Sequence, residues 1–415
     1  MVKKLIKNGL LIDGNGGEPQ KDSIVVTEDA RIVYTGSEQG YTASGDETIV
    51  DAQGGTILPG LIDSHVHMMM EYAPIAEKLT TPFSYMYYQA AQYLETTLQA
   101  GITTVRDALG ADRGVKKAIE DGLIQGPRMQ LSINALTTTG GHGDGYQVSG
   151  DVMDLLPSGY RGMPDGRCDG AGEVRKKTRE MLRAGAEVIK VHATGGVLSP
   201  TDHPEFTQFS PEELKVIVEE GRFRKGTKVM AHAQGAEGIK NAVQAGVHSI
   251  EHGIFLDDEA IELMLENGTY LVPTLLAPVA VLETADEKGM PTSAVQKSKE
   301  VIEQHNASIA KAHQAGVKIA MGTDAGVMKH GTNLRELGLM VDVGMSPMET
   351  IVATTKTAAE CLGWDDKVGT LEEGKQADVV IVKGNPLDDI NSLADNDTIQ
   401  LVMKDGDVAK NTLEK

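Results

Sequence analysis

The sequence predicts an α/β protein, a (β/α)8 TIM barrel with a small β-sandwich domain built from both chain ends. Two observations predict this fold. Through the middle of the chain, apolar β-type runs alternate with amphipathic helical stretches, which is typical of βα units and a parallel sheet. Both ends instead consist of short β-type runs separated by Gly, Asn and Asp, which is typical of antiparallel strands. We therefore place the sandwich in residues 1–58 and 360–415 and the barrel in residues 59–359.

The two ends of the chain share a pattern of short β-type runs that predicts one common sheet. The first end contains runs such as "DSIVVTEDARIVYTG" and "ETIVDAQGGTILPG". The last part of the chain returns to alternating apolar and polar residues in "KQADVVIVKGNP" and "TIQLVMKDGDVAK". Alternation with a period of two is the pattern of a half-buried strand. We therefore expect both ends to build one sheet domain together.

The middle of the chain contains eight candidate strands, the number that closes a (β/α)8 barrel. A doubly wound open sheet is the alternative, but no G-x-G-x-x-G motif opens a first helix. In a barrel the active site lies at the carboxyl ends of the strands, so the residues at those ends are the candidates for function. The predicted strands end near His67, Asp107, Asn134, His192, His232, His252, Thr274 and Asp324.

Composition excludes several classes of protein. The hydrophobic content of 40% allows a real core, and a formal charge of −21 would repel a phosphate backbone or an anionic membrane. No apolar stretch approaches the roughly 20 residues of a membrane helix, and the start of the chain lacks the features of a secretory signal. The two cysteines stand in no metal-binding spacing. We expect a cytoplasmic homo-oligomer that binds neither nucleic acid nor membranes and acts on a small molecule.

The motif "SHVH" places His65 and His67 at the end of the first predicted barrel strand. Residues i and i+2 of a strand point to the same side, so the two imidazoles can bind one metal ion. Alone, the motif also fits two surface or core histidines, because the chain has 11 histidines. Its position favours a metal site, because other predicted strands also end in side chains of ligand type: Lys190, His232, His252 and Asp324.

Lys190, Asp324 and His192 each allow two interpretations. An unpaired ammonium group beneath imidazoles is unfavourable, so Lys190 is either paired with a buried carboxylate or neutral. A neutral lysine can add carbon dioxide and become an anionic carbamate that bridges two cations. Asp324, in "GTDAG", either exposes its carboxylate at the mouth of the eighth strand or caps the next helix. His192 either faces the same side as Lys190 or packs at the strand end.

The order of these residues, H-x-H followed by strand-borne Lys, His, His and Asp, resembles the amidohydrolase superfamily over nearly the whole chain. The motifs that carry the resemblance are "LPGLIDSHVH", "IKVHATGGV", "MAHAQG", "IEHG" and "MGTDAG". The C-terminal "VGTLEEGKQADVVIVKGNPLDD" is similar to the segment that closes the β-sandwich of members. Within the superfamily the chain looks most like the binuclear dipeptidases for Xaa-Pro, Xaa-Arg and Xaa-Lys, which are related to imidazolonepropionase and to ochratoxin-type amidases.

The resemblance implies two divalent metal ions, for which we expect zinc, bridged by carboxylated Lys190. The implied ligands are His65, His67 and Asp324 for the more buried ion, and His232 and His252 for the other. Two ions about 3.5–4 Å apart lower the pKa of a shared water toward about 7 and polarise a carbonyl group. Asp324 would take the proton of that water as general base and return it to the leaving amine. The expected reaction is amide hydrolysis by a metal-bridging hydroxide.

Four further residues are candidates for binding the substrate. His142 lies where members of this branch resemble one another in "GGHGD", and it either donates to the substrate carbonyl or carboxylate or makes a local hydrogen bond. His330 and Arg335, in "MKHGTNLREL", could supply positive charge for an α-carboxylate, although Arg335 equally fits an ordinary helix surface. His203, in "SPTDHPEF" after the fourth predicted strand, could border the pocket.

Three functions remain open at this point. The first is a binuclear amidohydrolase that cleaves dipeptides or N-acyl amino acids with a free C-terminal carboxylate. The second is a cyclic-amide hydrolase or deaminase of the imidazolonepropionase type, which would usually use one metal ion without a lysine, so Lys190 argues against it. The third is a non-catalytic scaffold with a relic barrel, but no ligand of the expected set is missing.

Overall fold

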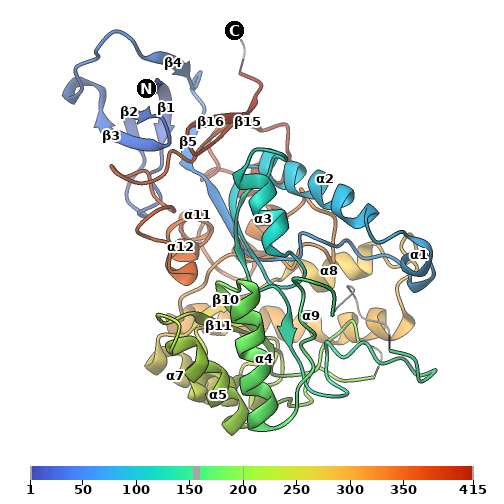
Figure 1. Cartoon of the computed structure of the whole chain (residues 1–415). Helices are drawn as coiled ribbons and strands as arrows, with labels where there is room; N and C mark the ends of the chain where they lie inside the picture. Colours follow the sequence, from blue (N-terminus) through green and yellow to red (C-terminus); the bar gives the residue numbers. More distant parts are fainter. Residues whose placement is uncertain (1, 153–158, 200, 414–415) are drawn as a thin grey trace.

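One sheet of the computed structural model, which describes residues 2–152, 159–199 and 201–413, is built from both ends of the chain (Figure 1). Its order is β16-β15-β14-β5-β1-β2-β3, and β4 pairs with β1. The N-terminal strands are β1 (Lys3–Leu11), β2 (Gln20–Glu28), β3 (Arg31–Ser37), β4 (Thr48–Asp51) and β5 (Thr56–Pro59). The C-terminal strands are β14 (Val379–Val382), β15 (Ile399–Lys404) and β16 (Asp407–Asn411). The prediction of one domain from both ends is confirmed.

The two chain ends are joined by the antiparallel pairing of β14 with β5. All four residues of each strand are buried, so the sequences "VVIV" and "TILP" form the centre of the sheet. Ile57, Val379 and Ile381 pack with apolar side chains of β1, β2 and β15 in one cluster. The other Leu and Val side chains of the two strands belong to the main core of the protein. Burial of such a continuous apolar run stabilises the pairing of strands that lie more than 300 residues apart in sequence, on the order of 1.5–3 kcal/mol per large side chain.

The barrel strands are parallel to their neighbours and form two arcs, β6-β7-β8 and β13-β12-β11-β10-β9. The first arc consists of β6 (Leu61–Val66), β7 (Ile102–Asp107) and β8 (Arg128–Leu131). The second consists of β9 (Ala135–Leu136), β10 (Val188–His192), β11 (Lys228–Ala233), β12 (Ser249–His252) and β13 (Tyr270–Val272). The third predicted strand is thus divided into β8 and β9, with Ile133 between them at a φ of 71°.

The eighth predicted strand closes the barrel without forming a regular strand. The segment around Asp324 makes single bridges, Leu271↔Ile319 to β13 and Val66↔Ala325 to β6. Gly322 lies so close to the first strand that a Cβ there would stand 3.0 Å from the backbone nitrogen of His65. Glycine permits this close approach. The closing segment is therefore short and irregular, and it brings Asp324 beside the end of β6.

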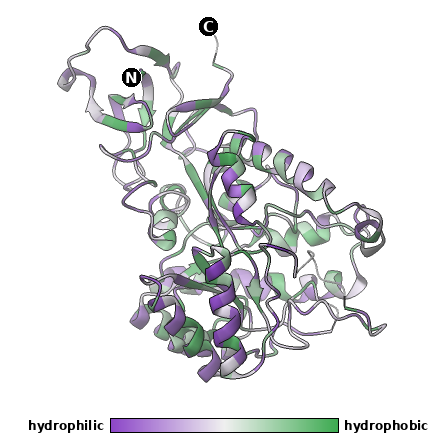
Figure 2. Cartoon of the chain, viewed as in Figure 1, coloured by the Kyte–Doolittle hydropathy of each residue, from purple (hydrophilic) through white to green (hydrophobic). Residues whose placement is uncertain are grey.

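Helices cover the barrel (Figure 1), and some of them begin at a side chain that caps the first turn. In α5, Ser210 and Glu213 form a capping box around Pro211. Figure 2 shows that α4 presents both hydrophilic and hydrophobic surface, in keeping with its buried residues Val174 and Met181. The helices are α1 (Ile75–Thr80), α2 (Tyr85–Gln99), α3 (Arg113–Glu120), α4 (Gly170–Ala184), α5 (Pro211–Arg222), α6 (Ala236–Ala245), α7 (Asp258–Asn267), α8 (Leu276–Glu283), α9 (Thr292–Ala315), α10 (Arg335–Asp342), α11 (Pro347–Ala353) and α12 (Lys356–Leu362), with 3-10 helices η1 (Glu38–Gly40) and η2 (Ile390–Ala394).

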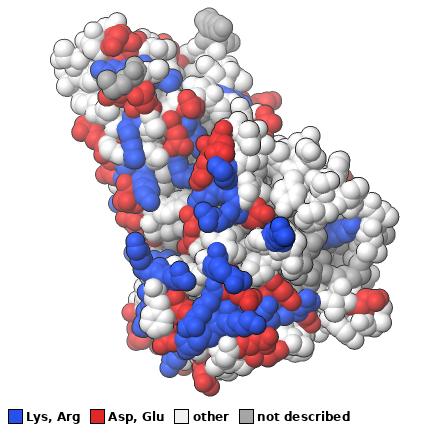
Figure 3. Space-filling view, viewed as in Figure 1, with Lys and Arg blue, Asp and Glu red and all other residues white. Residues whose placement is uncertain are grey.

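The charge of −21 is unevenly distributed over the surface. The face in Figure 3 carries a band of Lys and Arg over the α4 region with acidic residues around it. Part of this band is neutralised locally, because Arg175 and Arg179 of α4 pair with Glu220 of α5. Among the described residues, no helix has the length and apolarity needed to cross a bilayer. The cytoplasmic location and the homo-oligomer remain predictions, as do the domain boundaries at residues 58 and 359, the second of which falls within α12.

Candidate active site

A cavity of about 980 Å³ lies at the carboxyl ends of the barrel strands. This is the end at which barrel enzymes carry their active sites. Loops after several strands complete its wall, among them the Gly-rich loop that contains Gly141 and Gly143. The predicted site residues that line the cavity are His65, His67, His142, Lys190, His232, His252 and Asp324.

His65, His67 and Asp324 form a compact group at the mouth of β6. Asp324 Oδ1 lies 2.9 Å from His67 Nε2 and 3.5 Å from His65 Nε2. The possible ligand atoms of the three residues all lie within 4.8 Å of one another. Asp324 has a φ of 64°, a conformation that is costly for a residue other than glycine and is typical of functional sites. The three side chains could therefore hold one metal ion.

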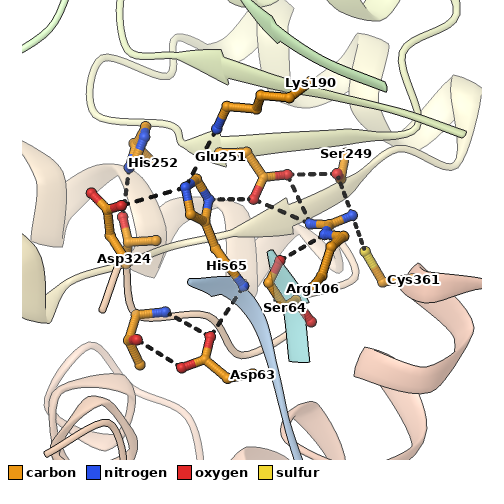
Figure 4. A network of polar contacts seen from close by, with 12 residues as sticks. Asp63, Ser64, His65, Arg106, Lys190, Ser249, Glu251, His252, Asp324 and Cys361 are labelled. Atoms are coloured by element: carbon orange, nitrogen blue, oxygen red, sulfur yellow. Dashed lines mark hydrogen bonds and ion pairs between the residues drawn. The ribbon is translucent and has the colours of Figure 1, made fainter. Parts of the chain in front are cut away.

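Asp63 fixes the backbone that carries this group (Figure 4). Its Oδ1 accepts hydrogen bonds from the N–H groups of His65 at 3.1 Å and Thr323 at 3.2 Å. Its Oδ2 accepts from Thr323 Oγ1 at 2.7 Å and Asn333 Nδ2 at 2.8 Å. Burial raises the pKa of Asp63 to about 6, although these hydrogen bonds oppose the shift. Asp63 thus ties β6 to the segment before Asp324.

Lys190 extends from β10 into the histidine cluster and is 2% exposed. Its Nζ lies 3.4 Å from His65 Nε2. Among the described residues, no carboxylate oxygen lies within 4.0 Å of this Nζ, so the alternative of a lysine paired with a carboxylate does not match the structure. Burial lowers the pKa of Lys190 to about 8. A buried lysine with no carboxylate at ion-pair distance in the described part of the chain is the unusual feature of the site.

His232 and His252 lie beside this group at the ends of β11 and β12. Their ring centroids are 4.5 Å apart, and the ring of His252 is 5.2 Å from that of His65. His252 has a φ of 76°. In a regular strand, His252 would point away from the barrel interior that Glu251 faces, and the left-handed backbone instead lets both residues face inward. This departure from the strand conformation brings His252 to the other histidines.

The predicted histidine ligands fit a divalent metal, because each uses one ring nitrogen for a protein partner and leaves the other for the site. The partners are Glu251 for His65, the Leu109 carbonyl for His67, the Gly195 carbonyl for His232 and the Thr274 hydroxyl for His252. Burial, followed by nearby cationic side chains, lowers the pKa of His65, His232 and His252 well below the ordinary value. Neutral imidazoles held through their second nitrogen are the form that binds metal.

His142 and His192 complete the wall of histidines. His142 stacks on His232 with ring centroids 4.3 Å apart, and its Nδ1 lies 2.9 Å from Ser199 Oγ and 3.5 Å from Asp202 Oδ2. His192 lines the cavity as well, and its buried Nδ1 has no hydrogen-bond partner in the described part of the chain. The position of His192 therefore agrees with the interpretation in which it faces the same side as Lys190.

Three of the predicted substrate-binding residues, His330, Arg335 and His203, do not line the cavity, and their role in binding stays a prediction. His330 is buried, and its Nε2 donates to the Met70 carbonyl at 2.9 Å. Arg335, at the start of α10, makes a bidentate pair with Glu283 at 2.8 and 2.9 Å. His203 is half-buried in its loop, whose Pro200 lies outside the described residues.

Sequence reasoning missed a buried ion pair behind His65. Glu251 Oε2 accepts from His65 Nδ1 at 2.8 Å, and Arg106 Nη2 donates to both carboxylate oxygens at 3.0 and 3.2 Å (Figure 4). Both charged side chains are 0% exposed. A signal was present, since "TTVRD" and "SIEH" each place a charged residue inside a predicted buried strand. A charge in such a position requires a partner.

Comparisons with known proteins place the chain among hydrolases. Residues 56–409 match the model of the amidohydrolase family. An ochratoxinase from Aspergillus niger is 36% identical over 422 residues, covering 98% of this chain and 86% of that protein. An imidazolonepropionase from Rhizorhabdus wittichii is 27% identical over 398 residues, covering 89% and 90%. A solved structure of a Xaa-Pro dipeptidase with bound methionine in the active site has a TM-score of 0.87 at 38% identity, covering 98% of this chain and 99% of that one.

These relatives include members of the branch that the motifs predicted, and the fold agrees with theirs. The family match begins in β5 and ends in β16, so it includes the barrel and part of the sheet domain. The chain belongs to the amidohydrolase family and is a hydrolase that acts on amide bonds.

Proposed function

We propose that the protein is a binuclear metal-dependent amidohydrolase that cleaves dipeptides or N-acyl amino acids with a free C-terminal carboxylate. The observation that carries the proposal is the set of four buried histidines and Asp324 around Lys190, a buried lysine with no carboxylate at ion-pair distance among the described residues. Such a set contains more ligands than one tetrahedral ion can use.

The ligands divide between two positions. His65, His67 and Asp324 would hold one ion, because their ligand atoms already lie together. The other ion would be held by His232 and His252, with the carbamate oxygens of carboxylated Lys190 shared between the two positions. When bound, the ions, for which zinc suits this mixture of imidazole and carboxylate, would activate a water and polarise the substrate carbonyl.

Two side chains of the cavity would move or donate protons. Asp324 Oδ1 is 2.9 Å from His67 Nε2, so its second carboxylate oxygen remains for the attacking water, from which it takes a proton before returning it to the leaving amine. His142 turns Nδ1 to Ser199, which leaves Nε2 for the substrate carbonyl or carboxylate. His142 thereby supports both binding and the stabilisation of developing charge.

Lys78 of α1 is the best placed cation for the substrate carboxylate. Among the cations that line the cavity, Lys288 pairs with Glu71 at 2.5 Å, Arg167 pairs with Asp165 at 3.0 Å, and Lys190 lies among the histidines. The ammonium group of Lys78 makes no ion pair or hydrogen bond within the described part of the chain, and burial lowers its pKa. An unpaired ammonium group in a partly buried cavity favours an anionic ligand.

The cavity wall beyond these groups is rich in apolar and aromatic side chains, including Phe83, Met86, Tyr146, Val152 and Leu198. Such a wall favours a substrate with a bulky apolar group on at least one side of the scissile bond. The names of two relatives, an ochratoxinase and a Xaa-Pro dipeptidase, are compatible with an amide substrate of moderate size.

The proposal is tested by metal analysis and by a substrate panel. Protein prepared with zinc and bicarbonate should hold two equivalents of metal per chain and should cleave Xaa-Pro, Xaa-Arg, Xaa-Phe and N-acyl amino acids in preference to their C-terminal amides. A stable value of one equivalent with full activity would contradict the binuclear site. Equal turnover of acid and amide would favour a neutral or cyclic amide substrate, as in the imidazolonepropionase relative.

A further inference from the structure

His65 is held by a stronger acceptor than the neighbouring histidines. His67 and His232 each donate a ring N–H to a backbone carbonyl oxygen, at 3.2 and 2.9 Å. His65 Nδ1 instead donates to a carboxylate oxygen of Glu251, at 2.8 Å. Hydrogen bonds to an ionised acceptor are roughly twice as strong as those between neutral groups. The orientation of His65 is thus fixed more firmly than that of the other two rings.

The surroundings of Glu251 determine which nitrogen of His65 carries the proton (Figure 4). Ser249 Oγ donates to Glu251 Oε1 at 2.6 Å, and Arg106 Nη2 donates to both oxygens. Because arginine has donors only, Glu251 acts as the acceptor, and Nδ1 of His65 must supply the proton. Nε2 of His65 then has a free lone pair that faces Lys190 Nζ at 3.4 Å.

Arg106 fixes the position and orientation of the Glu251 carboxylate. Its Nε donates to the Ser64 carbonyl at 2.6 Å, directly before His65 in the chain, and its Nη1 donates to Ser249 Oγ at 3.2 Å. The guanidinium of β7 therefore connects β6 with β12. A planar fork of donors fixes a carboxylate in direction as well as in distance.

We propose that Glu251, held by Arg106, is a positioning residue that keeps His65 in the tautomer with Nε2 free for metal, and that it thereby sets the metal affinity of the site formed with His67 and Asp324. Neither Glu251 nor Arg106 is among the described residues that line the cavity, so both act through His65. The inference rests on the proposed metal site. Groups that orient a ligand histidine typically account for 10–100-fold in metal affinity or activity.

The E251Q substitution tests the tautomer directly, because it keeps the side-chain shape and replaces one acceptor oxygen by an NH2 donor. If the amide oxygen accepts from Arg106, the NH2 group faces His65 Nδ1, and the ring must move its proton to Nε2. Protonated Nε2 cannot bind a metal ion. We expect roughly 10–100-fold weaker zinc affinity at one of the two positions, measured by competition with a chelator. The visible spectrum of cobalt-loaded E251Q should differ from that of the wild type.

Arg106 offers a matched pair of variants. R106M removes the donors that fix Glu251, so that the carboxylate is no longer held against His65 Nδ1, and zinc affinity should fall about tenfold. R106K keeps a cation beside Glu251 and should restore most of the affinity. R128M is the control, because Arg128 forms a largely buried pair with Asp378 at the other end of the barrel. It should lower thermal stability and leave zinc affinity within about twofold.

The outcomes separate this inference from the proposed function. Each variant is first shown to be folded, by cooperative unfolding of its zinc-free form, and its zinc affinity is then compared with that of the wild type. If the wild-type protein binds no metal, the proposed function itself is wrong. Two tightly bound zinc ions in the wild type, together with unchanged affinities and cobalt spectra in E251Q and R106M, would overturn the inference alone. If E251Q does not fold, the zinc affinities of R106M and R106K provide the test. Equal affinities in these two variants would overturn the inference.

Discussion

Buried polar side chains are treated in opposite ways at the two ends of the barrel. At the amino ends of the strands, Arg128 pairs with Asp378 at 2.7 Å and also with Asp405, and it donates to Thr104 Oγ1 at 2.9 Å. At the carboxyl ends, Lys190 has only His65 Nε2 as a partner, and His192 Nδ1 has none in the described part of the chain. At the first end Arg128 is satisfied by other side chains, whereas at the second Lys190 and His192 line a cavity.

The contrast separates stability from function. The paired charges of Arg128 and Asp378 connect the start of β8 to the residue before β14, so they join the barrel to the sheet domain. At the mouth, two candidate metal ligands, His252 and Asp324, stand on strained left-handed backbone. Strain of order 1–3 kcal/mol per residue persists only where the rest of the structure enforces it. We therefore expect substitutions at the mouth to change chemistry and those at the other end to change stability.

The Lys190→Ala substitution should have the largest effect on activity. Without the bridge, zinc content should fall below two equivalents, and kcat/KM should decrease at least about 10³-fold, because metal catalysis is worth several kcal/mol. Metal analysis and steady-state kinetics measure both. Lys404→Ala is the matched control, since Lys404 is a part-buried lysine that donates to the Gly126 carbonyl away from the cavity. Full activity and unchanged metal content in Lys190→Ala would make this lysine structural.

The Asp324→Asn substitution should lower kcat by at least about 10²-fold, the lower end of a general acid–base contribution. Some zinc should be lost as well, because the same carboxylate lies 2.9 Å from His67 Nε2 in the candidate metal group. Kinetics at saturating zinc separate the two effects. A near-normal kcat under these conditions would rule out Asp324 as the base.

The sequence predicted the architecture and the strand ends because both depend on local patterns. Hydrophobic periodicity located the strands, and the position of His65, Lys190 and His232 at strand ends marked the mouth of the barrel. The structure brings the predicted ligands around one cavity, while their role in binding metal remains a prediction. The left-handed backbone of His252 and Asp324 could not be predicted from local patterns, because tertiary contacts enforce it.

Pairings between distant residues could not be predicted from one sequence. Arg106 and Glu251 are 145 residues apart, and each alone is only a charged residue in a buried strand. The partner of Arg335 was missed for a related reason, since its side chain is paired with Glu283 of α8, and nothing in "NLREL" indicates this neighbour. Lys78 was missed because an unpaired cation is recognised only when its surroundings are known.

The Lys78→Gln substitution should raise KM for substrates with a free carboxylate about tenfold, near the lower value for a hydrogen bond to a charged group, because Lys78 is only partly buried. The same substitution should leave KM for the corresponding amides nearly unchanged. Lys176→Gln makes the same change of charge on the exposed surface of α4, and it should alter neither. Equal effects on acid and amide would show that Lys78 does not bind the carboxylate.

The Arg128→Met substitution should have the smallest effect on activity and a clear effect on stability. It leaves Asp378, which is 4% exposed, without its main partner, and breaking a largely buried pair costs roughly 3 kcal/mol. Urea unfolding of the zinc-free protein should show this loss of unfolding free energy, while kcat/KM stays within about twofold, because distant sites contribute independently. A large loss of kcat/KM in protein that remains folded and zinc-loaded would mean that the two ends of the barrel are coupled. The separation of stability from function would then not hold for this chain.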